Sequence, residues 1–454
     1  VLPFVNMSPD PEDEYFSDGL TEELIGSLAK VRDLHVTART SAFSFKGTKL
    51  DIRDIGQALS VRTVLEGSIR REQDHVRITA QLINVDDGYH MWSETYDHKL
   101  ENILSLQENI AKAIVAALRI QLSPEVDQQL STNTTINPRV YDLYLKGRYH
   151  WARINEVGFM QSIEAFQNAI ALDPGYAPAH AGLATVYSFM GYFGIMPPRQ
   201  SFPLSVIEAE KALALDPNSS EALIARGMAS LVYSWDWDRA GTDLSRALEL
   251  SPNDSLSHWA WSEYLAVVDP PAALDSALKA LSLDPVSLPI MNSVAFKYLV
   301  RGMYAEAIGM DEEMIAMDPN FAAAYWNLGV IHMLHGRFDI AINKFSSAAE
   351  RSGGMPPSVA LLAYAYAKLG ELEKAWSVLD QLNEMAKIRY ISPFYFAISY
   401  MGLDDFDTSI KYLKKAHEER DFRLHWIGLY VSERIFEPLQ SNSEYQEIIS
   451  NLWN

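Results

Sequence analysis

The sequence contains no cysteine, and this absence removes several classes of chemistry at once. Without cysteine there can be no disulfides, no thiolate-bound metals and no cysteine nucleophiles. The sequence also lacks any apolar run approaching the ~20 residues that a membrane-spanning helix needs, and no signal-peptide pattern opens it. We therefore predict no membrane span in this chain, and the lack of cysteine fits a reducing compartment.

Positive charge is scarce. Lys and Arg together number 38, against 59 Asp and Glu, which leaves a formal net charge of -21. Such a chain repels nucleic acid unless a local basic patch overrides its charge. The densest basic stretch has acidic neighbours, as a solvated helix face would: Glu418 and Glu419 follow Lys411, Lys414 and Lys415. We therefore predict that this chain binds no nucleic acid.

Motifs of known catalytic chemistry are also missing. The sequence has no glycine-rich phosphate loop followed by lysine, no strained serine elbow and no paired-carboxylate motif. His332 and His335 are three residues apart, but no carboxylate at matching spacing completes a metal site. We predict no catalytic residue, no metal ligand and no cofactor in this chain, and hence no enzyme activity of its own.

A regular series of proline stops runs through the last two thirds of the chain. The stops are Leu172-Asp173-Pro174, Leu215-Asp216-Pro217, Leu250-Ser251-Pro252, Leu283-Asp284-Pro285 and Met317-Asp318-Pro319. Successive prolines are 43, 35, 33 and 34 residues apart, and Gly353 stands at the next expected position. A period near 34 is typical of helical-hairpin solenoids, in which each unit buries its apolar face only by stacking on its neighbours.

The best-formed unit spans residues 322–351. Bulky and small side chains occupy the places that a tetratricopeptide unit gives them: Tyr325, Leu328, Gly329, Ala341, Phe345 and Ala348. The small residues let the paired helices approach closely, and the bulky ones fill the gap to the next hairpin. We predict about eight helical hairpins over 140–421, forming an all-α tetratricopeptide-type superhelical solenoid, and a divergent helical cap over 422–454. This architecture favours a binding scaffold.

The first part of the chain alternates between strand and helix patterns. We predict an α/β domain over 1–130 and a polar linker over 131–139. A short apolar strand at 1–5 precedes a helix for which Asp18 is the expected cap. Further predicted elements are a strand at 35–39, a helix from Asp51, a hairpin of 64–69 with 76–82, a strand at 89–96 and an amphipathic helix from Ile103 to Leu118.

Five sequence blocks of this domain carry a family resemblance. They are Val1-Leu2-Pro3-Phe4, Glu14-Tyr15-Phe16-Ser17-Asp18-Gly19, Leu65-Glu66-Gly67-Ser68, Arg77-Ile78-Thr79-Ala80-Gln81-Leu82-Ile83 and Met91-Trp92-Ser93-Glu94-Thr95-Tyr96-Asp97. In this order they resemble the TolB-like amino-terminal domain, a family that is coupled to tetratricopeptide repeats in bacterial signal transduction proteins. The resemblance implies that this chain is a regulatory portion of such a protein.

The resemblance also implies a partner in cis. Similar proteins usually carry an upstream effector, which is a class III adenylate or guanylate cyclase, a winged-helix DNA-binding domain or a protein kinase. The chain opens at Val1 directly into an apolar run, so we expect an upstream part. A cytoplasmic location is implied, with the periplasm behind a membrane anchor as the alternative. A homodimer is left open.

In this repeat architecture the first helix of each hairpin lines a concave groove, which usually reads a peptide or protein partner. The repeat pattern places there Tyr144, Glu221, Ile224, Met228, Trp259, Glu263, Asn292, Phe296, Trp326, Val330 and Met333. Aromatic and apolar groups of this kind suit a partner hot spot. The alternative is that the superhelix closes and packs some of these side chains against itself or against the first domain.

The long step of 43 residues predicts an insertion between the helices of the second hairpin, around 191–203. Its candidate contact residues are Tyr192, Phe193, Met196 and Phe202. Two functions fit the whole pattern. The first is a non-enzymatic regulatory and protein-interaction module that binds a peptide or protein in the groove. The alternative is the regulatory part of an adenylate or guanylate cyclase whose catalytic domain lies upstream of Val1.

Overall fold

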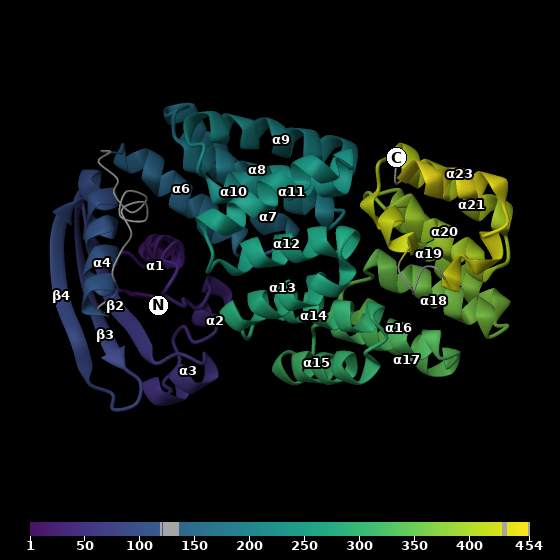
Figure 1. Cartoon of the computed structure of the whole chain (residues 1–454), viewed down its shortest axis with the longest axis horizontal. Coiled ribbons are helices and arrows are strands. Elements are labelled where there is room, and N and C mark those ends of the chain that lie inside the picture. Colours follow the sequence, from purple (N-terminus) through teal and green to yellow (C-terminus); the bar gives the residue numbers. More distant parts are fainter. Residues whose placement is uncertain (119, 121–135, 429–433, 453–454) are drawn as a thin grey trace.

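The computed structural model describes residues 1–118, 120, 136–428 and 434–452. Figure 1 shows a small α/β domain at one end of the molecule and a long array of paired helices that fills the rest. The general arrangement of the predicted fold class is confirmed, because a sheet-containing amino-terminal part is followed by a tetratricopeptide-like helical solenoid.

A four-stranded sheet forms the centre of the first domain. Its strands are β1 (Val5–Asn6), β2 (Thr63–Glu72), β3 (His75–Asn84) and β4 (His90–Lys99), in that spatial order. β1 runs parallel to β2, and the other neighbours are antiparallel. β2 and β3 pair along their whole length around a tight turn, so the predicted hairpin is confirmed and is longer than expected.

Helices cover one face of this sheet. The main ones are α1 (Glu14–Ala29) and α4 (Ile103–Ala117), and η1 (Pro11–Asp13), α2 (Arg39–Phe43), α3 (Ile52–Ala58) and η2 (Leu100–Asn102) complete the domain. The side chains predicted to share one face of β3 all lie in the hydrophobic core: Val76, Ile78, Ala80 and Leu82. The period-2 pattern of this strand therefore reports its buried face correctly.

Three local predictions in this domain are wrong. Asp18 does not cap a helix, because α1 already begins at Glu14 and the Asp18 carboxylate pairs with Lys46 at 2.6 Å. Residues 35–38 form no strand, and Arg39 begins α2. The apolar run at 1–5 contributes only its last residue to β1. Apolar runs of five residues or fewer mark burial, but they are too short to fix the type of element.

The solenoid consists of helical hairpins. In the described part of the chain eight follow one another: α6 (Pro138–Trp151) with α7 (Glu156–Leu172), α8 (Ala177–Tyr192) with α9 (Pro198–Leu215), α10 (Ser220–Ala229) with α11 (Trp237–Leu250), α12 (Ser255–Val268) with α13 (Pro270–Leu283), α14 (Leu288–Val300) with α15 (Tyr304–Met317), α16 (Ala322–Leu334) with α17 (Phe338–Arg351), α18 (Pro356–Lys368) with α19 (Leu372–Ala386), and α20 (Pro393–Gly402) with α21 (Phe406–Glu418). A short π-helical segment, η3 (Ser230–Ser234), extends α10.

The proline stops end the second helix of each of the first five hairpins. The residue before each proline directly follows a helix: Asp173, Asp216, Ser251, Asp284 and Asp318. In three of these turns the aspartate accepts a hydrogen bond from the backbone N–H two residues later, at 2.9 to 3.0 Å. Proline cannot continue the helix, and the aspartate stabilises the turn that replaces it.

Glycines set the spacing between paired helices. A Cβ added at Gly329 would lie 2.5 Å from the ring of Phe345, and one at Gly147 would lie 2.4 Å from the ring of Phe166. Both phenylalanines are almost fully buried. The small residue and the aromatic residue of the repeat pattern are therefore in direct contact, which explains why the two occur together.

The step of 43 residues between Pro174 and Pro217 lengthens a helix and does not form a large insertion. α8 ends at Tyr192 and α9 begins at Pro198, so the connection is only residues 193–197. α9 is 18 residues long, against 14 in α11, and Pro203 lies inside it. The prediction of an insertion over 191–203 is wrong, because a proline near the start of a long helix resembles a loop signal in the sequence.

The carboxy-terminal segment folds back on the second hairpin. It contains η4 (Phe422–Gly428), η5 (Glu437–Leu439) and α23 (Ser443–Leu452). Phe422 stacks on Tyr192 with ring centroids 5.0 Å apart, and Arg423 donates to the Tyr192 carbonyl at 3.3 Å. The array therefore closes on itself. Of the predicted linker, 131–135 lie outside the described residues, and Pro138 already begins α6.

Candidate functional site

A pocket of about 1140 Å³ lies between the first domain and the inner surface of the solenoid. α1 and residues 36–40 form one side of it. The first helices of successive hairpins, from α6 to α18, form the other side, and Tyr395, Phe422 and Arg423 line its far end. Because both parts of the chain line it, the shape of this pocket depends on how the first domain docks on the solenoid.

A largely buried arginine links three elements around the pocket. Arg148 of α6 donates from Nε to Glu22 of α1 at 3.0 Å and from a terminal nitrogen to Glu221 of α10 at 2.6 Å. Arg39 pairs with the second oxygen of Glu22 at 2.9 Å. The guanidinium groups thereby compensate carboxylates that would be costly to bury alone.

Glu23 of α1 lies beside this network, and a tyrosine of the solenoid, not an arginine, donates a hydrogen bond to it. The hydroxyl of Tyr144 donates to Glu23 Oε1 at 2.7 Å. Burial raises the pKa of Glu23, while the charge of Arg148 and the hydrogen bond from Tyr144 lower it. Burial also raises the pKa of Tyr144, so its hydroxyl keeps the proton that it donates. At this contact the first domain thus supplies Glu22 and Glu23, and the solenoid supplies Arg148 and Tyr144 as donors to them.

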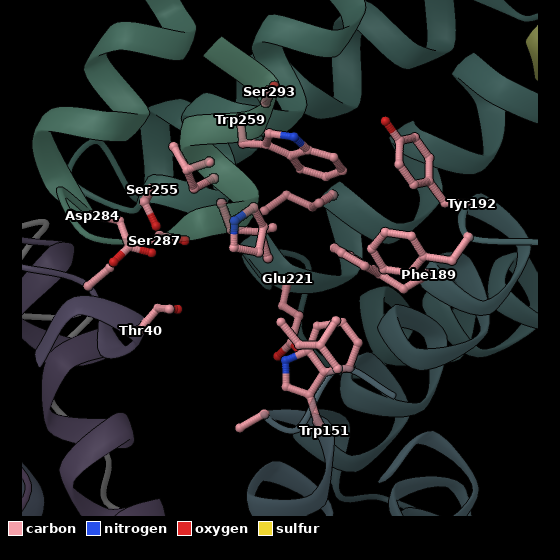
Figure 2. Close-up of a pocket in the computed structure, with 18 of the residues that line it drawn as sticks. Thr40, Trp151, Phe189, Tyr192, Glu221, Ser255, Trp259, Asp284, Ser287 and Ser293 are labelled. Carbon is pink, nitrogen blue, oxygen red and sulfur yellow. The ribbon is translucent and has the colours of Figure 1, made fainter. Parts of the chain in front are cut away.

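Aromatic rings form one wall of the pocket. Figure 2 shows Trp151, Phe189, Tyr192 and Trp259 arranged around the cavity, with Glu221 between them. Trp151 and Phe189 meet edge to face at 4.7 Å between centroids, and Trp259 lies 5.6 Å from both Phe189 and Tyr192. Such rings give large apolar contact areas with little loss of side-chain freedom on binding.

The opposite wall is polar. Thr40 of the first domain lies beside Ser255, Asp284 and Ser287 of the solenoid on this side of the cavity (Figure 2). Hydroxyl and carboxylate groups at this wall can accept or donate hydrogen bonds, whereas the aromatic wall cannot do so with its ring faces. The pocket therefore has the composition of a binding site, with apolar bulk on one side and a few polar groups on the other.

A second ion pair fixes the aromatic wall. Glu263 of α12 accepts from Lys297 Nζ at 2.7 Å and from the Ser293 hydroxyl at 3.1 Å. Its other oxygen accepts from the Tyr192 hydroxyl at 3.3 Å. These contacts hold the Tyr192 ring edge-on against Trp259, and burial raises the pKa of the Tyr192 hydroxyl.

Asn253, in the turn between α11 and α12, holds the end of α1. Its side-chain nitrogen donates to the carbonyls of Val31 at 2.9 Å and Arg32 at 3.0 Å, and its backbone N–H donates to that of Ala29 at 3.3 Å. Carbonyls at the end of a helix have no partner within the helix. A turn residue of the solenoid thus caps a helix of the first domain.

Asp284 docks the start of α2 in a similar way. Its Oδ1 accepts from the backbone N–H of Ser41 at 2.8 Å and from the Ser41 hydroxyl at 2.6 Å. Burial raises the pKa of Asp284, and its bonds to Ser41 lower it. The turn that contains Asp284 differs in sequence from the other four. The residue after its proline is Val286, whereas the other turns have glycine or asparagine there: Gly175, Asn218, Asn253 and Asn320.

The Asn253→Ala change is expected to lower the free energy of unfolding by about 0.5–1.5 kcal/mol, because the carbonyls of Val31 and Arg32 lose a side-chain donor, while the Val31 carbonyl keeps its bond from the Leu34 N–H. Hydrogen exchange should also become faster at the end of α1. Asn320→Ala is the matched control, since Asn320 occupies the same turn position but is exposed; we expect a change within about 0.5 kcal/mol. Equal destabilisation by both changes would contradict the capping role of Asn253.

The structure distributes the predicted groove residues over two environments. Eight line the pocket: Tyr144, Glu221, Ile224, Trp259, Glu263, Asn292, Phe296 and Trp326. The other three are buried in the core of the solenoid: Met228, Val330 and Met333. Several of the eight also make contacts within the chain, as Tyr144 does with Glu23, so the groove is partly filled by the protein itself, as the alternative interpretation predicted.

The four residues predicted in the insertion also separate. Tyr192 and Phe193 line the pocket. Met196 packs against the core of the first hairpins, and Phe202 is fully buried in α9. Arg148, Trp151 and Phe189 also line the pocket and were not predicted to do so, because a repeat pattern does not show which polar or aromatic residues a docked domain will enclose.

Two further features of the described part of the chain bear on function. No three of its histidine, aspartate and glutamate side chains are grouped so that they could hold a metal ion. None of its helices is both long and apolar enough to cross a membrane.

Comparison with known proteins adds a relative and a set of repeat structures. No family model matches the sequence. Over 186 residues the chain is 41% identical to the protein named "putative adenylate cyclase 3" of Rhizobium meliloti (strain 1021). That match covers 41% of this chain and 32% of the relative, so the chain matches only about a third of that protein's length.

Among solved structures, PilW, described as a type IV pilus biogenesis factor, is 20% identical, and the match covers 46% of this chain and 94% of PilW with a TM-score of 0.37. YrrB, described as a TPR protein with an unusual peptide-binding site, is 19% identical, and the match covers 43% of this chain and 97% of YrrB with a TM-score of 0.30.

Proposed function

We propose that this chain is a non-enzymatic regulatory and protein-interaction module of a bacterial signalling protein, and that its pocket binds an extended peptide segment. The observation that carries the proposal is a pocket lined jointly by the first domain and by the inner helices of the solenoid. A segment bound there would touch both parts of the chain at once.

The size and composition of the pocket favour a peptide over a small metabolite. Its volume of about 1140 Å³ exceeds the range of roughly 300–1,000 Å³ that is usual for small-molecule sites. Twelve of the 60 lining residues are aromatic, whereas aromatic residues make up 11% of the whole chain. Rings of this density are typical of hot spots that anchor side chains of a protein partner.

Binding would change the docking of the first domain. A ligand shifts a conformational equilibrium only if it interacts differently with the two states. A peptide that contacts α1 and α12 together is bound fully only when the first domain is docked, so it favours the docked state. The upstream effector would then respond to the position of the first domain.

The effector that we propose is a nucleotide cyclase, because the sequence relative carries that name. The five sequence blocks that resemble the TolB-like family are compatible with this assignment, since a cyclase is one of the three kinds of effector that the resemblance implies, beside a winged-helix DNA-binding domain and a protein kinase. We accordingly propose a cytoplasmic location. In the full-length protein a pocket ligand should change the rate of cyclic-nucleotide production, while this chain alone should produce none.

The binding proposal is tested by selecting peptides from a phage-displayed random library on the intact chain and measuring their affinity by calorimetry. Ala323→Trp places a bulky ring in the pocket, where Ala323 lies half-buried, and should weaken binding at least ~10-fold. Ile340→Trp on the outer helix α17 is the matched control and should bind as the natural chain does. Failure to select any peptide, or equal binding by both variants, would refute the proposal.

A further inference from the structure

We infer that β4 is a dimerisation edge, at which two copies of this chain pair their β4 strands antiparallel into one continuous sheet. β4 is the last strand in the order β1-β2-β3-β4, so among the described residues only β3 pairs with it. In Figure 1 it forms the outer margin of the first domain, on the side away from the solenoid. No described residue of β4 lines the pocket, so this surface is separate from the proposed peptide site.

The backbone groups of alternate β4 residues point away from β3. The N–H of Leu100, one residue beyond β4, donates to the Asp74 carbonyl at 2.7 Å, which sets the phase of the ladder. Hydrogen-bonded and non-hydrogen-bonded pairs alternate along an antiparallel ladder. The residues whose N–H and C=O face outward are therefore Ser93, Thr95, Asp97 and Lys99. A row of such groups is a template for another strand.

β4 is neither short nor interrupted by proline, which are two of the features by which proteins usually protect an edge strand, although it carries charged side chains and a register irregularity opposite Leu82 and Ile83. It is 10 residues long, against a usual length of about 5–6. It contains no proline, and its one lysine is its last residue, Lys99. Seven of its residues are exposed and none is buried. The opposite edge of the sheet, β1, has only two residues.

A second copy fits this edge because β4 is complementary to itself. Around a twofold axis, opposite residues of an antiparallel pair lie on the same face of the sheet. A register centred on Tyr96 places Glu94 opposite the partner's His98, and the outward-facing Thr95 opposite the partner's Asp97. Each pair occurs twice, once on either side of the axis. A register centred on Glu94 would oppose two carboxylates and is disfavoured.

Sedimentation of the intact chain over a range of concentrations tests this pairing. The natural chain should show a monomer–dimer equilibrium, and Thr95→Pro should weaken it at least ~10-fold, because proline removes an outward N–H and spares the bonds to β3. Thr95→Val is the matched control, since it keeps the N–H; both variants lose the Thr95 hydroxyl contact with Thr79 at 3.3 Å. A chain that stays monomeric, or variants that dimerise equally, would overturn the inference.

A second pair of variants tests the register and does not rely on proline. His98→Glu opposes the partner's Glu94 with a like charge and should weaken the dimer by about 2–5-fold, whereas His98→Lys should strengthen it by a similar factor. Glu94 and His98 of one copy are four residues apart on a strand, so they are too far from each other to produce this difference within a monomer. Shifts in the same direction for both variants would rule out this pairing.

Discussion

Replacing Arg148 with methionine is expected to lower the free energy of unfolding by about 3 kcal/mol, the lower end of the cost of breaking a buried ion pair. The change leaves Glu221 without its cation and leaves Glu22 with Arg39 alone. The lower end applies because the Glu221 side chain keeps 25% of its exposure to solvent. Chemical denaturation at neutral pH, followed by circular dichroism, measures the loss.

Arg246→Met is the matched control for this change. Arg246 pairs with Glu249 on the outer face of α11, and both side chains are about half exposed. Exposed pairs of this kind contribute well under 1 kcal/mol. Adding Glu221→Gln to Arg148→Met should recover part of the loss, since the unpaired charge is removed. Additive losses in that double variant would show that Arg148 does not act through Glu221.

The Asp311→Asn variant is expected to flatten the dependence of stability on pH. Asp311 of α15 is fully buried; its Oδ1 accepts from Asn327 Nδ2 at 2.8 Å, and its Oδ2 has no hydrogen-bond partner among the described residues. Burial raises the pKa of Asp311 to about 8, and the bond from Asn327 opposes this. Over part of the physiological range the folded protein therefore holds a proton that the unfolded chain has lost.

The sign of the effect follows from proton binding. Between the ordinary aspartate pKa of 3.8 and about 8, this group makes the free energy of unfolding fall as pH rises, by about 1.4 kcal/mol per unit. Near pH 4 the variant should be less stable than the natural chain by the cost of its new unpaired amide N–H, about 1–3 kcal/mol. At pH 7 the variant should be more stable by up to about 4 kcal/mol, less the cost of the new unpaired amide N–H, about 1–3 kcal/mol.

Asp380→Asn on the exposed face of α19 is the control, and it should leave the pH dependence of the natural chain unchanged. Urea unfolding at several pH values measures all three chains. Parallel curves for the natural chain and the Asp311→Asn variant would show that Asp311 is already ionised at low pH in the folded protein.

The repeat spacing predicted the helical hairpins because each unit repeats one local solution. Gly329 with Phe345 and Asp318 before Pro319 make contacts within one hairpin or one turn, and such contacts are specified over short stretches of sequence. The hairpin of β2 and β3 was predictable for the same reason, since alternation in Val76, Ile78, Ala80 and Leu82 fixes its buried face locally.

The site was less predictable, because it depends on contacts between residues far apart in the sequence. Arg148 meets Glu22 across 126 positions, and Ser41 meets Asp284 across 243. Pro203 was predicted to lie in an insertion, because proline is common in loops. The structure places it inside α9, a helix that the sequence around the proline does not indicate. Met228 and Val330 satisfy the groove pattern but lie in the core, since superhelical curvature decides which side chains remain accessible.

The sequence by itself therefore determined the α/β part, the hairpin repeat and the acidic net charge of -21, because composition and short-range periodicity encode them. Only the tertiary structure decided that the first domain docks on repeat turns, that the array closes through Tyr192 and Phe422, and that a shared pocket lies between them. Docking depends on the summed geometry of many hairpins, and a small rotation in each one moves distant side chains together or apart.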